Sequence, residues 1–289
     1  MERMPPCRPA HCGRRAGRHT LEPKNQTKPK LSDMLLYTSG TGNTEWVATE
    51  LGRLLDEPPF DIAKEIGCCG QITYRPNEGR LILVFPVHSW GPALLVDRFL
   101  AGARFENIRE VWAVMTCGDM CCNADKILAG MLERNGHYTI DGCFSVQMPN
   151  NYILMKGFGL DAPEVAQSKL LAAPQRVRQI AQCIAERRAA PELYIRGDHP
   201  ALKSFVYRLF RRYVAGSTKF KVDEDRCVGC ERCAKVCPTQ NITIADHLPE
   251  WGDDCLQCSA CIHRCPEQAI EWGRITHEAG RYHHPSIRV

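Results

Sequence analysis

"MLLYTSGTGNTEWVATEL", residues 34–51, places two glycines and several hydroxyl side chains between an apolar stretch and a predicted helix. Such a loop is typical of a phosphate site, because glycine lets successive backbone N–H groups converge on an anion. The following helix adds the positive end of its dipole. Its apolar residues at 47, 51, 54 and 55 fall on one face. The loop therefore predicts a bound phosphate group and leaves open which compound carries it.

The loop departs from two common nucleotide motifs. A Walker A loop needs a lysine after its glycines, and none follows here. The dinucleotide fingerprint needs a third glycine at position 45, where Glu45 stands. A loop with only neutral donors suits a terminal monophosphate, such as that of flavin mononucleotide (FMN). The predicted phosphate-binding residues are Ser39, Gly40, Thr41, Gly42, Asn43 and Thr44.

Strand-like and helical segments alternate after this loop. The predicted strands lie at 80–88, 110–118 and 138–148, and the predicted helices at 93–101, 121–134 and 161–188. Alternation of this kind predicts an α/β domain with a doubly wound parallel sheet. We expect Pro174 to kink or divide the last helix.

Three loops at the carboxyl ends of these strands are candidates for a flavin ring site, since ligands of such sheets bind there. They read "PVHSWGP" (86–92), "TCGDM" (116–120) and "MPNNY" (148–152). Trp90 and Tyr152 offer rings for stacking, although each could instead be a core or turn residue. The predicted ring contacts are Pro86, His88, Ser89, Trp90, Gly91, Thr116, Cys117, Gly118, Asp119, Asn150, Asn151 and Tyr152. Cys117, Cys121 and Cys122 are expected to be free buried thiols rather than a further metal site.

Eight of the 17 cysteines fall in two matching runs, "CVGCERCAKVCP" (227–238) and "CLQCSACIHRCP" (255–266). Both follow C-x2-C-x2-C-x3-C-P, which is typical of two [4Fe–4S] clusters in which the fourth cysteine of each run binds the other cluster. One predicted ligand set is Cys227, Cys230, Cys233 and Cys265, and the other is Cys255, Cys258, Cys261 and Cys237. Structural zinc is the alternative, but zinc ribbons do not repeat this spacing.

Together these motifs resemble bacterial flavodoxin–ferredoxin fusion proteins of the EFR-type ferredoxin family, over about residues 34–274. The resemblance implies a flavodoxin-like sheet of order 2-1-3-4-5, an FMN site and a small α+β domain with two [4Fe–4S] clusters. The expected divisions are a disordered basic tail (1–33), a flavodoxin-like FMN-binding domain (34–188), a linker with an amphipathic helix (189–217), a ferredoxin domain (218–274) and a C-terminal tail (275–289). "CGDMCCNAD" departs from the family pattern, since smaller residues are expected after "TCGD".

Charge is concentrated at one end of the chain. Residues 1–33 contain eight Lys or Arg and three acidic residues, within a formal net charge of +4 for all 289 residues. No aromatic residues interleave these charges, so a solvated tail is expected rather than a nucleic-acid-binding arm. No apolar run exceeds five residues, as at 81–85, which is too short to span a membrane. These features, with no apparent signal peptide, predict a cytoplasmic protein.

The linker contains an apolar stripe of Leu202, Phe205, Val206, Leu209, Phe210 and Tyr213, beside Lys203, Arg208, Arg211 and Arg212. A basic amphipathic helix can lie on a membrane or meet an acidic partner. We expect this one to pack its apolar stripe on its own protein.

The predicted function is electron transfer between two [4Fe–4S] clusters and FMN, with redox proteins as donor and acceptor. An FMN-dependent reductase of a small organic substrate is the alternative, with Tyr152 or His88 as proton donor. A redox sensor with structural clusters is a third hypothesis.

Overall fold

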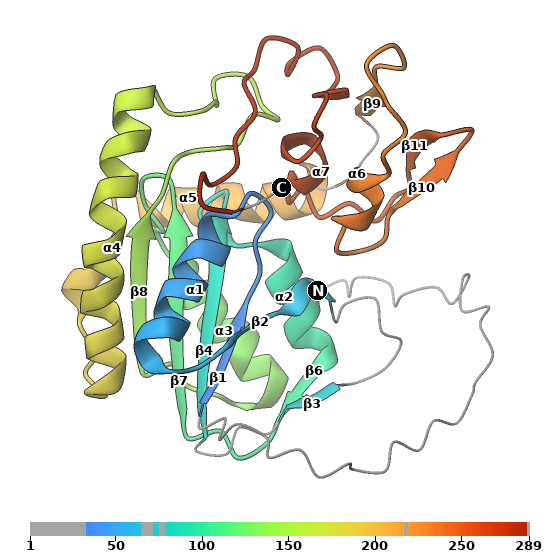
Figure 1. Cartoon of the computed structure of the whole chain (residues 1–289). Helices are drawn as coiled ribbons and strands as arrows, with labels where there is room; N and C mark the ends of the chain where they lie inside the picture. The colour runs from blue at the N-terminus through green and yellow to red at the C-terminus, as the bar shows by residue number, and fades with distance from the viewer. Residues whose placement is uncertain (1–32, 65–71, 75–78, 215, 217–218, 288–289) are drawn as a thin grey trace, which may run out of the picture. The chain divides into compact units, whose positions relative to one another are not determined.

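Five parallel strands form the central sheet of the N-terminal half (Figure 1). The computed structural model describes residues 33–64, 72–74, 79–214, 216 and 219–287, so residues 1–32 of the expected tail lie outside the described residues. The strand order is β2-β1-β4-β7-β8. Numbered as five successive strands this is 2-1-3-4-5, the flavodoxin-like order, as predicted. Their bounds are β1 Asp33–Tyr37, β2 Pro59–Asp61, β4 Arg80–His88, β7 Glu110–Cys117 and β8 Gly142–Gln147.

Four helices cover the two faces of this sheet: α1 (Asn43–Leu55), α2 (Leu94–Gly102), α3 (Ala124–Gly136) and α4 (Pro163–Ala185). Successive strand residues point to opposite faces, so a strand buried on both sides is apolar throughout. One core joins alternate strand residues to α1 and α4, among them Leu35, Ile82, Val84, Trp112, Val114 and Phe144. The other joins the intervening residues to α2 and α3, among them Leu36, Leu83, Phe85, Ala113 and Met115.

Two sequence-based boundaries are wrong in detail. The expected strand at 138–148 begins only at Gly142, because the side chain of Asp141 accepts a hydrogen bond from the Val111 N–H at 2.7 Å, just before the strand pairing starts. Helix α4 is not divided: it is 23 residues long and contains Pro174 within its length. Ala173 and Val177, on either side of the proline, are buried against the sheet. This packing holds the helix together where the proline ring removes one backbone hydrogen bond.

The C-terminal half contains two short antiparallel pairs. Strand β9 (Phe220–Val222) pairs with β12 (Ile270–Trp272), and β10 (Ile242–Ala245) pairs with β11 (Leu248–Trp251). Single turns of helix, α6 (Arg232–Lys235) and α7 (Ala260–His263), lie within the two cysteine runs. The apolar core of the C-terminal half includes Ile153 and Leu154 from the loop after β8, so side chains of the two halves pack together. This is the small α+β arrangement expected for residues 218–274.

The linker helix α5 (Pro200–Leu209) and the π-helical turn after it, η3 (Phe210–Val214), bury only part of the predicted apolar stripe. Tyr207 and Phe210 are buried, whereas Leu202, Phe205, Leu209 and Tyr213 are exposed. Tyr207 turns inward because Gly91 has no side chain: a Cβ there would lie 2.4 Å from the tyrosine ring. The Tyr207 hydroxyl donates to the Pro92 carbonyl at 2.7 Å, which fixes the helix in this rotation.

The remaining short elements are η1 (Ile62–Lys64), β3 (Ile72–Tyr74), β5 (Gly91–Pro92), β6 (Ala103–Phe105) and η2 (Pro191–Leu193). None of the helices described by the structure is long and apolar enough to cross a bilayer.

Candidate iron–sulfur and flavin sites

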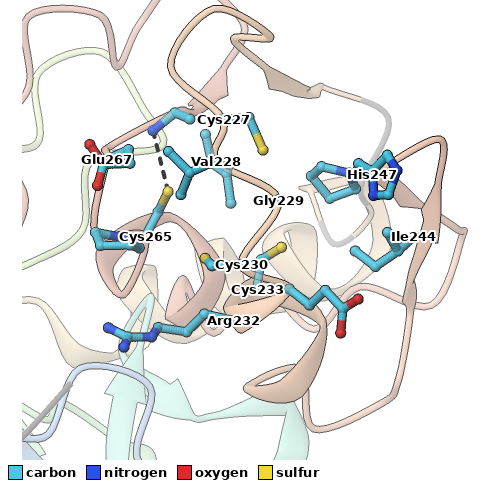
Figure 2. A pocket seen from close by; sticks show the side chains of 15 residues that line it. Cys227, Val228, Gly229, Cys230, Arg232, Cys233, Ile244, His247, Cys265 and Glu267 are labelled. Atoms are coloured by element: carbon cyan, nitrogen blue, oxygen red, sulfur yellow. Dashed lines mark hydrogen bonds between the residues drawn. The ribbon is translucent and has the colours of Figure 1, made fainter.

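The eight clustered cysteines surround two hollows, four to each. The first ring consists of Cys227, Cys230, Cys233 and Cys265 around a hollow of about 390 Å³, part of which is open to solvent (Figure 2). The second ring consists of Cys237, Cys255, Cys258 and Cys261 around a hollow of about 350 Å³, which is also partly open to solvent. Each ring therefore takes three cysteines from one run and the fourth from the other run. This is the grouping that the sequence predicts for two [4Fe–4S] clusters.

The spacing of the thiols suits a cluster better than one ion. A zinc ion binds sulfur at about 2.3 Å, so its ligands converge on a point. In the part of the chain that the structure describes, no three His, Cys, Asp or Glu side chains are close enough to share one metal ion. The cysteines instead stand apart around a space. Four separated thiols fit a cubane cluster, in which each sulfur binds a different iron.

The backbone repeats itself as the sequence does, at an interval of 28 residues. Glu231 and Ser259, one residue after the second cysteine of each run, have φ values of 58° and 59°. The N–H of Asn241 donates to Cys237 Sγ at 3.4 Å, and the N–H of Ala269 donates to Cys265 Sγ at 3.3 Å. Such hydrogen bonds stabilise negative charge on a ligand sulfur and help to set the potential of a cluster.

Burial disfavours free thiolates at these positions. It raises the pKa of the Cys258 thiol to about 11 and that of Cys255 to about 12. A coordinating cation reverses this effect, since a metal-bound thiol is deprotonated. The rings are therefore suited to hold positively charged iron rather than to act as free nucleophiles.

The predicted phosphate loop leads directly into the N-terminus of α1. Gly42 has a φ of +95°, a left-handed conformation that favours glycine, and no side chain caps the helix. The Gly42 N–H donates to Ser39 Oγ at 3.0 Å, which closes the turn. The first N–H groups of a helix lack partners within it. An uncapped, glycine-led helix N-terminus fits an anion bound by backbone donors.

The polar side chains of the loop hold the neighbouring loops together. Thr44 and Thr116 share a hydrogen bond of 2.7 Å between their hydroxyls. The Asn43 amide donates to the Pro149 carbonyl at 3.0 Å, and the Asn151 amide donates to Thr41 Oγ1 at 2.7 Å. The structure thus brings the phosphate loop together with two of the three predicted ring loops. Because the side chains of Thr41, Asn43 and Thr44 already have partners in the protein, a phosphate bound here would depend on backbone N–H groups.

The third loop forms a two-residue hairpin between β4 and β5. His88 pairs with Gly91, and the turn residues Ser89 and Trp90 have φ values of 48° and 65°. Turns with two positive φ values favour Asn and Gly, so a Ser-Trp pair is strained and puts the indole at the tip of the hairpin. His88 Nδ1 is buried without a hydrogen-bond partner among the described residues. Burial lowers the pKa of His88 to about 4, so its ring is neutral. A neutral imidazole with an unused nitrogen fits a site for a polar ligand.

The loops after β7 and β8 are in close contact. A Cβ on Gly118 would overlap the Asn150 side chain at 1.6 Å, so only glycine allows this approach. The Asn150 N–H donates to the carboxylate of Asp161 at 2.9 Å, and Lys169 pairs with the same carboxylate at 2.7 Å. Tyr152 does not face an open space, since its hydroxyl donates to Gln257 Oε1 at 3.3 Å. Cys117, Cys121 and Cys122 are buried, as expected.

Several residues of this region were not among the predicted site residues. Arg264 Nε donates to the Gly40 carbonyl at 2.9 Å, and the Tyr282 hydroxyl donates to Asn43 Oδ1 at 2.6 Å. The His284 ring stacks on Trp46 at 5.2 Å between centroids. These residues come from the second cysteine run and from the expected C-terminal tail. They share no spacing with the loop, so only the folded chain reveals the contact.

The second ring lies against the phosphate loop. A Cβ on Gly40 would stand 2.2 Å from the Cys258 carbonyl oxygen. Arg98 pairs with Asp254, the residue before Cys255, at 2.5 Å. In the first ring, by contrast, Cys230 is exposed, and so is the neighbouring Val228. One ring is thus next to the phosphate loop and the other reaches the surface.

Acid is expected to loosen the contact of His284 with the phosphate loop. Burial, aided by His283, lowers the pKa of His284 from 6.5 to about 4. Above pH 6.5 the ring is neutral whether packed or released. Between pH 6.5 and 4 only the released ring binds a proton, so the packing weakens as pH falls, by roughly 2 kcal/mol at most.

The measurement is hydrogen exchange of the residue 284 amide, which donates to the Thr41 carbonyl at 2.9 Å. We expect exchange at pH 5 to be several-fold less protected than at pH 7, after correction for the intrinsic rate. His284→Phe keeps a ring on Trp46 and should abolish this difference. An unchanged difference in that variant would show that another group titrates.

Comparisons with known proteins agree with an iron–sulfur segment. Residues 220–243 match the 4Fe-4S binding domain family. No match was found among curated proteins. A candidate flavoprotein from Bacteroides uniformis ATCC 8492 is 14% identical, with a TM-score of 0.36, over 53% of this chain and 99% of its own. An FMN-dependent NADH-azoreductase from Bacillus anthracis, solved with FMN, is 13% identical, with a TM-score of 0.32, over 53% of this chain and 99% of its own. At these values the likeness to the solved structures carries no functional inference.

Proposed function

We propose that this chain is an electron-transfer protein that binds two [4Fe–4S] clusters and FMN. The observation that carries the proposal is the contact of Gly40 with the Cys258 carbonyl, which joins the second cysteine ring to the phosphate loop. When bound, the clusters exchange single electrons and FMN takes up one or two, so the three groups couple one- and two-electron chemistry.

The residues of the chain position these groups. The first ring, with Cys230 exposed, offers a place of exchange with an external redox protein. The second ring supplies the link to the phosphate loop, and Arg264 fastens the two through Gly40 and Glu45. The α1 N-terminus binds the phosphate, and the hairpin tip with Trp90 supports the flavin ring. We also propose that the chain exchanges electrons with separate redox proteins and that it is located in the cytoplasm.

A substrate-reducing flavoenzyme has less support. The Tyr152 hydroxyl is engaged by Gln257, and burial raises its pKa to about 12. Burial lowers the pKa of His88 to about 4, so near neutral pH it lacks the acidic imidazolium proton that a general acid would give. Neither of the two proton donors expected for a reductase is therefore suited to that role.

The test is anaerobic purification followed by chemical counts of iron, sulfide and FMN per chain. We expect about eight irons, about eight sulfides and one FMN. A spectroscopic redox titration should then show both the clusters and the flavin. Four irons, or no flavin, would remove the corresponding half of the proposal. Reoxidation of the reduced protein by small organic acceptors, if much faster than the background, would favour the reductase instead.

A further inference from the structure

The outward side of α5 and η3 is an exposed apolar face, which we define as Leu202, Phe205, Leu209 and Tyr213. Their relative exposures are 64%, 57%, 41% and 71%. Single exposed apolar side chains are ordinary, but four on one side of a helix form a continuous patch. These are side chains that the sequence pattern predicts to be buried. The helix instead packs on the protein through Tyr207 and Phe210.

Positive charge borders this face. Residues 200–214 contain Lys203, Arg208, Arg211 and Arg212 and no acidic residue. Arg211 is neutralised by Asp97, and Lys203 lies on the inner side, with Nζ 5.5 Å from the centroid of the Trp90 ring. Arg208 is exposed beside the apolar side chains, and the exposed Arg212 donates a hydrogen bond to the Tyr213 hydroxyl at 3.2 Å. The face therefore combines apolar anchors with cationic groups at its edge.

Charge disfavours two occupants from this chain itself. The N-terminal segment, residues 1–33, has eight basic and three acidic residues, so its net sign is the same as that of the face. A second copy placed face to face would bring two faces of the same positive sign together, with Arg208 on each. Like charges in a close contact are destabilising. An anionic occupant therefore matches the charge of this face.

We propose that this face binds the surface of a membrane that contains anionic lipids. Four side chains on one convex helix are far fewer than the 20–30 residues that each side of a stable protein interface uses. A lipid surface needs only a few apolar anchors, because the negative potential of the whole surface adds to their burial. Arginine suits this edge, since its stem lies along apolar surface while its charge remains in water.

Such binding would set the candidate flavin site close to the lipid. The inner side of the same helix contacts two of the predicted ring loops: Lys203 Nζ lies 2.8 Å from Met120 Sδ, and Tyr207 packs on Gly91. The diameter of one helix, about 10 Å, separates the two sides. An electron acceptor or donor held at the membrane surface would thus meet the chain at this end. This consequence depends on the proposed function, whereas the lipid contact does not.

The experiment is cosedimentation of the purified full chain with vesicles of phosphatidylcholine alone, or with 30% phosphatidylglycerol, at low and at high salt. We expect the chain to pellet with the anionic vesicles at low salt, and binding to fall at least tenfold at 0.5 M salt, where charges are screened. Phe205→Ser with Leu209→Ser, and separately Arg208→Glu, should each reduce binding at least tenfold. Because these side chains are exposed, the variants should retain the fold and their iron content.

Helix α4 supplies matched controls, since Leu171 and Arg178 are also exposed. Leu171→Ser and Arg178→Glu change the same properties elsewhere and should bind like the parent. Failure to pellet with anionic vesicles, or equal binding by all the variants, would overturn the proposal. Binding to polyglutamate through the same residues, without binding to vesicles, would assign the face to an acidic protein. None of these outcomes depends on FMN or on cluster content, so they leave the proposed function to its own test.

Discussion

Gly40→Ala is expected to weaken FMN binding at least tenfold and to lower the free energy of unfolding by about 1–3 kcal/mol. The added methyl group would stand 2.2 Å from the Cys258 carbonyl oxygen and 3.7 Å from the Ala260 nitrogen. Both neighbours are backbone atoms next to the second cysteine ring, so neither can move away as a flexible side chain would. Either the phosphate loop or the ring must shift. Isothermal titration with FMN and chemical denaturation measure the two effects.

Gly102→Ala is the matched control, because a Cβ at that position meets nothing within 4 Å. It should leave FMN binding unchanged. Gly40 is not among the residues with positive φ, so the penalty at Gly40 is steric rather than conformational. FMN binding by Gly40→Ala equal to that of the parent would show that the loop and the ring are not in close contact in solution.

Double substitutions are expected to reveal how the two runs share their ligands. With Cys237 in the second ring, Cys237→Ser combined with Cys255→Ser damages one cluster and should leave about four irons per chain. Cys237→Ser combined with Cys227→Ser damages both clusters and should leave almost none. If each run instead held its own cluster, these two results would be exchanged. Iron analysis after anaerobic purification distinguishes the cases.

The loss of the second ring should have the larger functional effect. This ring adjoins the phosphate loop, so Cys237→Ser is expected to slow reduction of the bound flavin by an external one-electron donor at least 100-fold, as stopped-flow absorbance measures. Cys143→Ser, in strand β8 and outside both rings, controls for the loss of a thiol. Flavin reduction as fast in Cys237→Ser as in Cys143→Ser would contradict the proposed link.

Local patterns were sufficient for much of the fold. Apolar strands with helices between them predict the doubly wound sheet, because strands covered on both faces have no polar side. The two cysteine runs predict the two rings, because ligand spacing acts within a few residues. The position of Pro174 was misleading, since contacts with the sheet on both sides of it outweigh one missing hydrogen bond.

Contacts between distant segments could not be predicted in the same way. Arg264, Tyr282 and His284 reach the phosphate loop only through the folded chain, and nothing in their own neighbourhood marks them. The prediction that the apolar stripe of the linker is buried was wrong for four of its six residues, for a related reason. Periodicity identifies an amphipathic helix, but the side that is buried depends on space for Tyr207 over Gly91, 116 positions earlier in the chain.

The pairing of β9 with β12 affects the order in which parts of the protein can fold during synthesis. Strand β9, the first of the C-terminal half, can pair only when β12, the last, has been synthesised. Each ring likewise needs cysteines from both runs. When a ribosome has released the chain only as far as residue 245, neither ring is complete. The second ring gains its last cysteine at 261 and the first ring at 265. Either ring is therefore completed only after the residues of the N-terminal sheet have been synthesised, when that sheet is already free to fold.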